Sequence, residues 1–129
     1  MNKEQLEDVK RLIQLVVQNL PCPICSTHAN SHFNKFKFTT IRTLAELRTY
    51  LWDFHNNVNS RTDKPRITFE EHLLIYQRMD FSNVLQHFIQ TYQHISNTTV
   101  TMMLYSFHRQ TMLKQVSLYF KSNAYLFTA

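Results

Sequence analysis

The sequence predicts an all-α protein that folds as a compact helical bundle. Apolar residues recur at steps of three and four along most of the chain, which is typical of the buried face of a helix. Runs in which apolar and polar residues alternate strictly, as in half-buried strands, are absent. The 129 residues include no glycine, so tight hairpins and glycine-rich phosphate loops are not expected.

Two helices are expected before residue 40. The first covers residues 2–20 and ends at Pro21. Its buried stripe consists of Leu6, Val9, Leu12, Ile13, Val16, Val17 and Leu20. The second begins with Cys22 as its cap and Pro23 at its first position, and it runs to about Phe33. The following cluster FNKFKF is interpreted as a loop whose aromatic residues reach the core.

Capping boxes mark the next two helices. Thr43 and Glu46 predict a helix over residues 44–59, and Thr68 and Glu71 predict another that opens near Phe69. The first of these has one apolar stripe, formed by Leu44, Leu47, Leu51, Phe54 and Val58.

The remaining sequence is also helical in pattern. An apolar stripe from Phe81 to Tyr92 indicates either a separate helix started at Asp80 or a continuation of the helix before it. The cluster SNTT at 96–99 predicts a turn, and a last helix to about Phe120 precedes the tail AYLF, which we expect to pack. We therefore divide the chain into a helical core, 1–79, and a helical C-terminal extension, 80–129, that packs on the core or on a partner.

Composition narrows the class of protein. The apolar runs are too short for a membrane span, and the polar start MNKEQLEDVK lacks the form of a secretory signal, so we expect no membrane partner and no secretion by its own signal. The net charge is +5, yet the basic residues are scattered and no nucleic-acid-binding fold is indicated, so no specific nucleic acid is predicted. No acidic residue follows Asp80, and we interpret this modest positive bias first as a solvated face; an acidic protein surface or nucleic acid as the partner is the weaker alternative.

The stretch LPCPICSTHA, residues 20–29, holds the only two cysteines, Cys22 and Cys25. A thiol at a helix N-terminus feels the positive end of the helix dipole, which favours the thiolate and suits redox chemistry. Cys25 lies one turn inside the helix, where it can close a short disulfide with Cys22, and His28 follows on the same face. Zinc is the alternative, with His28 and His32 as further ligands, but three of the four would lie on one helix, so no metal is predicted. Two inert cysteines remain a third interpretation.

The helix at 44–59 has a second face. Trp52, His55, Asn56 and Asn59 follow at i, i+3, i+4 and i+7, and together offer an aromatic ring, an imidazole and two amides. This composition suits a planar, nitrogen-rich ligand. The alternative is that Trp52 belongs to the core and the amides are solvated.

Taken together, LPCPICSTHA and LWDFHNNVNSRTDKP resemble the Erv/ALR family of FAD-linked sulfhydryl oxidases, and the small viral members most of all. The resemblance covers roughly half of the chain. The matching residues are Cys22, Cys25, His28, Trp52, His55, Asn56, Val58, Asn59 and Lys64.

The resemblance implies a helical bundle that holds FAD beside a redox-active disulfide. Cys25 would lie next to the flavin ring, and Cys22 would be attacked by incoming thiols. The cofactor would be contacted by His28, Trp52, His55, Asn56, Val58 and Asn59, and its phosphates by Lys64 and Arg61. The implied function is an FAD-dependent thiol oxidase that forms disulfide bonds in viral proteins and passes electrons to oxygen, giving hydrogen peroxide.

Two departures from the family leave an alternative open. The usual first helix, with its Trp and His, is missing, and either Phe107 and His108 of the extension replace them or the extension binds another protein. A second cysteine pair is also missing, so electrons would arrive from protein thiols or a thioredoxin-like carrier. The alternative is a non-catalytic structural or interaction protein of a virus particle. We also expect that the chain forms a homodimer or binds another virion protein. The host cytoplasm or the virus particle is the expected location.

Overall fold

The computed structural model describes residues 1–20, 23–77, 81–93 and 100–127. Within these ranges the protein has six α-helices, two short 3-10 helices and no strand, so the predicted all-α fold is confirmed. The helices are α1 (Lys3–Gln18), α2 (Pro23–Lys35), η1 (Phe38–Thr40), α3 (Leu44–Arg61), α4 (Phe69–Gln77), α5 (Phe81–Gln93), α6 (Val100–Asn123) and η2 (Ala124–Leu126). The expected turn at 96–99 and the expected cap residue Cys22 lie outside the described residues.

Side-chain caps fix the starts of the helices. Asn2 accepts a hydrogen bond of 2.8 Å from the Gln5 amide, and the Gln5 side chain accepts one of 2.8 Å from the Asn2 amide, which is a complete capping box for α1. The Thr43 hydroxyl accepts from the Glu46 amide at 3.1 Å and caps α3 as predicted. The Glu46 carboxylate turns instead to the amide of Arg42, one residue before the cap.

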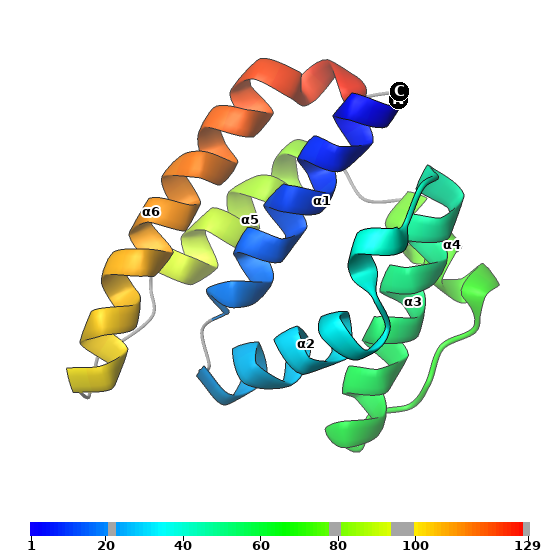
Figure 1. Ribbon diagram of the computed structural model, residues 1–129, viewed down its shortest axis with the longest axis horizontal. Coiled ribbons are helices and arrows are strands. Elements are labelled where there is room, and N and C mark those ends of the chain that lie inside the picture. Colours follow the sequence, from blue (N-terminus) through cyan, green and yellow to red (C-terminus); the bar gives the residue numbers. More distant parts are fainter. Residues whose placement is uncertain (21–22, 78–80, 94–99, 128–129) are drawn as a thin grey trace.

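The helices form two groups that α2 joins (Figure 1). In the first group α1, α5 and α6 lie side by side, with α6 antiparallel to α1. In the second group α4 packs against α3. Helix α2 leaves the C-terminal end of α1 and crosses toward α3, so it lies against both groups. Among the described helices, none is long and apolar enough to span a bilayer.

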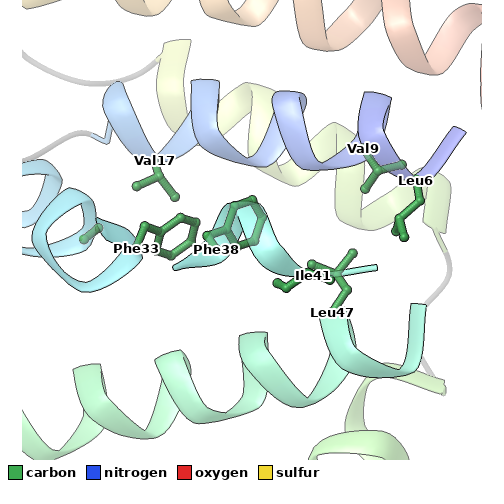
Figure 2. Close-up of a cluster of buried hydrophobic side chains, with 8 residues drawn as sticks. Leu6, Val9, Val17, Phe33, Phe38, Ile41 and Leu47 are labelled. Carbon is green, nitrogen blue, oxygen red and sulfur yellow. The ribbon is translucent and has the colours of Figure 1, made fainter. Parts of the chain in front are cut away.

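Two apolar clusters hold this arrangement together. The first lies between α1, α2, η1 and α3, with Phe33 and Phe38 stacked at a centroid distance of 4.5 Å (Figure 2). The second lies between α1, α5 and α6 around Met112 and Val116, which are 0% and 2% exposed. The tail folds back as expected, because Phe127 packs against Tyr119 and the first cluster. In the FNKFKF segment Phe33 and Phe38 are buried as predicted and Phe36 is half exposed. The expected loop is shorter than predicted, because α2 continues to Lys35 and η1 begins at Phe38.

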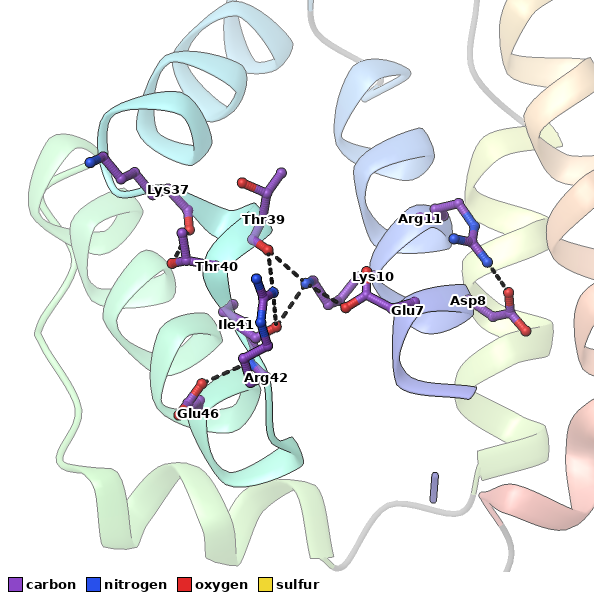
Figure 3. A network of polar contacts seen from close by, with 10 residues as sticks. All are labelled: Glu7, Asp8, Lys10, Arg11, Lys37, Thr39, Thr40, Ile41, Arg42 and Glu46. Atoms are coloured by element: carbon purple, nitrogen blue, oxygen red, sulfur yellow. Dashed lines mark hydrogen bonds and ion pairs between the residues drawn. The ribbon is translucent and has the colours of Figure 1, made fainter. Parts of the chain in front are cut away.

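A buried lysine ties α1 to the turn that precedes α3. The Lys10 side chain is 4% exposed, and its ammonium donates to the carbonyl oxygens of Thr39 at 3.0 Å and Ile41 at 2.8 Å, and to the Glu7 carboxylate at 3.0 Å (Figure 3). An ammonium has three donors, so each of them is used here. A buried charge is tolerated when every donor is matched in this way.

Two turns use positive φ without glycine. Among the described residues, Lys37 has φ 48° and Asp63 has φ 57°. At the end of α3, the Lys64 amide donates to the Asn59 carbonyl at 2.8 Å and the Thr62 amide to the Val58 carbonyl at 3.0 Å. The first of these bonds, with Asp63 in the left-handed region, has the form of a Schellman motif. Helix α3 therefore ends at Arg61, two residues beyond the expected end.

Candidate cofactor and thiol site

The first turn of α2 presents the described cysteine to solvent. Cys25 is exposed, and Ile24 beside it is 67% exposed although it is a large apolar residue. The next residue, Ser26, is buried, and its hydroxyl accepts a hydrogen bond of 2.9 Å from the Leu20 amide. This bond ties the backbone at Leu20, just after α1, to the first turn of α2, which carries Cys25.

Further along α2, His28 is exposed and His32 is buried. The His32 ring lies 4.6 Å from the Phe36 ring, 5.1 Å from the Phe54 ring and 5.8 Å from the Tyr50 ring, measured between centroids. Burial lowers the pKa of His32, and the charge of Asp53 opposes that shift in part. His32 is therefore a neutral ring at pH 7 and forms part of the contact between α2 and α3.

A cavity of about 500 Å³ opens on α3. It is lined by Arg48, Leu51, Phe54, His55, Val58 and His72. The rings of His55 and His72 lie 6.4 Å apart at 75°, and burial, aided by the charge of His55, lowers the pKa of His72. A volume between about 300 and 1,000 Å³ is usual for small-molecule sites, so the cavity has the size of a ligand pocket.

Two of the predicted cofactor residues line this cavity, namely His55 and Val58. The sequence analysis missed Arg48 and His72 there. Arg48, Leu51, His55 and Val58 fall at i, i+3, i+7 and i+10, which is a helical stripe that was visible in the sequence. The sequence predicts Leu51, Phe54 and Val58 as part of the apolar stripe, and Leu51 and Phe54 do contact the first apolar cluster while they also line the cavity.

Trp52 and Asn56 serve the loop that joins α3 to α4. The Trp52 indole and the Asn56 amide both donate to the carbonyl of Ile67 at 2.8 Å, and the Ile67 amide donates back to the Asn56 side chain at 2.8 Å. Asn56 is 1% exposed, and the Trp52 ring meets Phe69 edge-on at 5.7 Å. In the structure both side chains therefore hold the loop between α3 and α4, whereas the resemblance assigns them to the cofactor.

The last predicted residues lie at the C-terminal end of α3. Asn59 is 7% exposed, and Arg61 and Lys64 are exposed on either side of the Schellman turn. Arg61 lies six residues after His55, somewhat under two helical turns, and Lys64 lies just beyond the end of the helix. His108, the expected replacement for the missing family histidine, lies instead against the end of α1, in a different cavity from His55.

Metal ligation receives no support in the part of the chain that is described. No three of its His, Cys, Asp and Glu side chains gather as metal ligands would. Cys22 lies outside the described residues, so the four-ligand zinc set is not tested as a whole.

These features define an all-α bundle with an exposed cysteine, Cys25, in the first turn of one helix and a ligand-sized cavity on the helix that packs against it. The chain belongs to the Erv1/Alr family, whose model matches residues 1–80. The resemblance stated from the sequence is therefore confirmed. The match ends at residue 80 and leaves α5 and α6 outside it.

Three relatives are similar to part of this chain. They are the FAD-linked sulfhydryl oxidases of a Kenyan pig isolate, a Malawian tick isolate and a Namibian warthog isolate of African swine fever virus. Each is 32% identical over 76 residues, which is 59% of this chain and 62% of the relative. The chain thus aligns with less than two thirds of each relative. No solved structure matches the chain.

Proposed function

We propose that this protein is an FAD-dependent thiol oxidase that forms disulfide bonds in viral proteins. The observation that carries the proposal is the exposed Cys25 in the first turn of α2, within a chain that belongs to the Erv1/Alr family. The relatives at 32% identity are named FAD-linked sulfhydryl oxidases, which supports the same activity.

The cavity on α3 fits part of a flavin nucleotide. Its apolar side chains, Leu51, Phe54 and Val58, suit a planar ring, and Arg48 supplies a permanent cation. His55 and His72 add imidazole groups that can hydrogen-bond ring nitrogens and oxygens. Arg61 and Lys64, exposed at the end of the same helix, are placed to meet phosphate. Trp52, Asn56 and Asn59 support this site by holding the α3 end and the following loop.

The reaction starts with thiol–disulfide exchange at the cysteine pair. A substrate thiolate attacks Cys22 of the oxidised pair, forms a mixed disulfide and releases Cys25 as a thiolate. A second substrate thiol then displaces Cys22, so the substrate loses two electrons and two protons and the pair becomes a dithiol. Bound FAD would take those two electrons and pass them to oxygen, which leaves as hydrogen peroxide.

The chain itself supports the first half of this sequence. The helix N-terminus stabilises a thiolate in the first turn of α2, which makes the Cys25 sulfur a better leaving group. The Leu20 to Ser26 hydrogen bond holds that turn in position. The donors of electrons are protein thiols or a thioredoxin-like carrier, since the chain has no second cysteine pair.

The rival proposal is a non-catalytic virion protein on the same fold. One observation favours it. Trp52 and Asn56, which the resemblance assigns to the cofactor, donate hydrogen bonds to the Ile67 carbonyl of their own chain. The absorbance spectrum of the purified protein, after FAD is added and the excess removed, decides between the two. A flavin band that bleaches with dithiol and recovers in air supports the oxidase, provided that Cys22→Ser and Cys25→Ser abolish the bleaching. A colourless protein that retains no FAD contradicts it.

A further inference from the structure

A groove lies between α5 and α6, in the part of the chain beyond the family match. Its volume is about 670 Å³, and its lining consists of Ile89, Gln110, Leu113, Lys114, Ser117 and Leu118. The five α6 residues fall at i, i+3, i+4, i+7 and i+8, so they share one face of the helix. We call this cavity the α5–α6 groove. It shares no residue with the cavity on α3.

The α5–α6 groove combines apolar side chains with one cation. Leu118 is 65% exposed although it is a large apolar residue, and Ile89 and Leu113 are half-buried. Lys114 is exposed, one turn before Leu118 on the same face. Residues 81–129 contain no Asp or Glu, so no acid of α5 or α6 can pair with Lys114. The groove therefore suits a helix that brings both an acid and an apolar side chain.

Helix α4 of the same chain has such a face. Glu70, Glu71, Leu74 and Ile75 are all exposed, and they cover one side of the helix. Leu74 and Ile75 are 53% and 44% exposed, which leaves two large apolar side chains in contact with water. Among the described residues, neither the Glu70 nor the Glu71 carboxylate forms an ion pair. The opposite side of α4 packs against α3.

The two surfaces match in spacing as well as in chemistry. Glu70 precedes Leu74 by four residues and Lys114 precedes Leu118 by four, so each charge lies about 6 Å along the helix axis from its apolar residue. A helix α4 that lies parallel to α6 therefore places Glu70 at Lys114 and Leu74 at Leu118 in one register. In Figure 1 α4 and α6 lie on opposite sides of the molecule, so α4 cannot reach the groove of its own chain.

We infer that α4 of one copy docks in the α5–α6 groove of a second copy of this chain. The occupant follows from the complementary charges, the matched spacing and the separation of the two surfaces within one chain. The contact joins two different surfaces, so it occurs twice in a closed dimer or repeats in a longer assembly. None of the residues on either surface lines the cavity on α3, and the cysteines take no part. The inference is thus independent of the proposed function.

Sedimentation velocity of the full chain, without flavin and with a reducing agent to prevent disulfide cross-links, tests for this association. One nine-residue helix in a groove buries a small area, so we expect weak association with a midpoint of about 10 to 100 μM. Between about 1 μM and about 1 mM, the monomer should give way to larger species. A monomer at every concentration would overturn the inference and leave the groove to a different partner.

Charge reversal identifies the two surfaces. Lys114→Glu and Glu70→Lys each bring like charges together and should weaken association about tenfold. When the two variants are mixed, every contact again joins opposite charges, so association should return to within about threefold of that of the unmodified protein. Lys3→Glu is the matched control, because it changes the net charge by the same amount at an exposed position outside the groove. A mixture that stays monomeric, or a control that weakens association as much, contradicts this contact.

Leu118→Gln tests the apolar half of the contact without a change of charge. Its position is 65% exposed, so the fold should be kept while association weakens about five- to tenfold. Tyr125→Gln, at a position 67% exposed outside the groove, is the control and should associate like the unmodified protein. Equal helix content by circular dichroism excludes unfolding as the cause. If Leu118→Gln associates as strongly as the control, the groove is not the docking surface and the inference is wrong.

Discussion

Asn56 and Ile67 bond to each other twice, once in each direction, and both hydrogen bonds are 2.8 Å long. The Asn56 amide thus pairs with both the N–H and the C=O of one residue, as a neighbouring strand would do in a β-sheet. It fixes the loop after α3 against the helix, and through that loop the position of α4 and His72 at the cavity.

Replacing Asn56 by Ala should lower the free energy of unfolding by about 1 to 2 kcal/mol, because the amide of the half-buried Ile67 loses its acceptor. The Trp52 indole still donates to the Ile67 carbonyl in this variant. The loss of stability is therefore smaller than if both the N–H and the C=O of Ile67 lost their partners. Urea denaturation measures the change. The control is Asn57→Ala at the exposed neighbour, which should stay within about 0.5 kcal/mol of the unmodified protein; equal losses would contradict the anchoring role.

Replacing Lys10 by Met should cost about 1 to 2 kcal/mol, since the carbonyls of Thr39 and Ile41 would then lose the Lys10 ammonium and keep only the Arg42 guanidinium, which donates to them at 3.0 Å and 3.5 Å. Methionine keeps the length of the side chain, so packing changes little. Thermal or urea unfolding measures the loss. Lys3→Met, at an exposed position of the same helix, is the comparison and should have little effect.

Stability should fall on mild acidification because of His32. Its pKa is lowered in the fold by burial, so the unfolded chain binds a proton first as the pH drops. The neutral His32 ring contributes its full stabilisation above pH 6.5, the ordinary pKa of histidine. That stabilisation is lost as the pH falls from 6.5 through the lowered pKa that His32 has in the folded protein. Urea midpoints between pH 8 and about pH 5 should show this slope. His32→Phe should reduce the slope to the part due to His72, whose pKa burial also lowers, and the exposed His28→Gln should leave the slope as it is; an unchanged slope in His32→Phe would assign the effect elsewhere.

The Tyr50 hydroxyl should lose its proton at a higher pH than the hydroxyls of exposed tyrosines. Burial first, and the charge of Asp53 second, raise its pKa to about 12. Its hydroxyl is buried and has no hydrogen-bond partner among the described residues. Tyr50→Phe should therefore remove the highest-pH step in an ultraviolet titration without loss of stability. Tyr125→Phe, at a position 67% exposed, should leave that step in place.

Val58→Trp should block the cavity on α3. Val58 lines it and is half-buried, so the indole would occupy the space proposed for the flavin. Retention of FAD should fall at least about tenfold, with unchanged helix content by circular dichroism. Asn57→Trp adds the same ring at the exposed neighbouring position and should retain FAD; similar loss in both variants would argue against this cavity.

The helices were predictable where local chemistry defines them. The Thr43 and Thr68 hydroxyls accept from the amides three residues on, as the capping boxes indicated. The ends were less predictable. Helix α1 stops at Gln18 rather than near Leu20, because the Asn19 side chain turns back to the Leu15 carbonyl at 2.8 Å. Helix α3 extends to Arg61 because Asp63 takes a conformation that sequence patterns associate with glycine.

The site was predictable in part, for a similar reason. Spacing on one helix identified His55, the family resemblance added Val58, and both line the cavity. It could not show that Ile67, eleven residues from Asn56, folds back to bond its side chain. Nor could it show that His72 of α4 faces His55, because helix periodicity contains no information on which helices meet. The roles proposed for Cys22 and Cys25 stay predictions.

The turns at Lys37 and Asp63 also affect the unfolded chain. Glycine would adopt their positive φ angles at no steric cost, whereas a side chain at such a position costs roughly 1 to 2 kcal/mol. The same side chains restrict the denatured ensemble, and a chain with no glycine at all has fewer backbone conformations to lose when it folds. The strain in two native turns is thus offset by a smaller loss of backbone entropy along the whole chain.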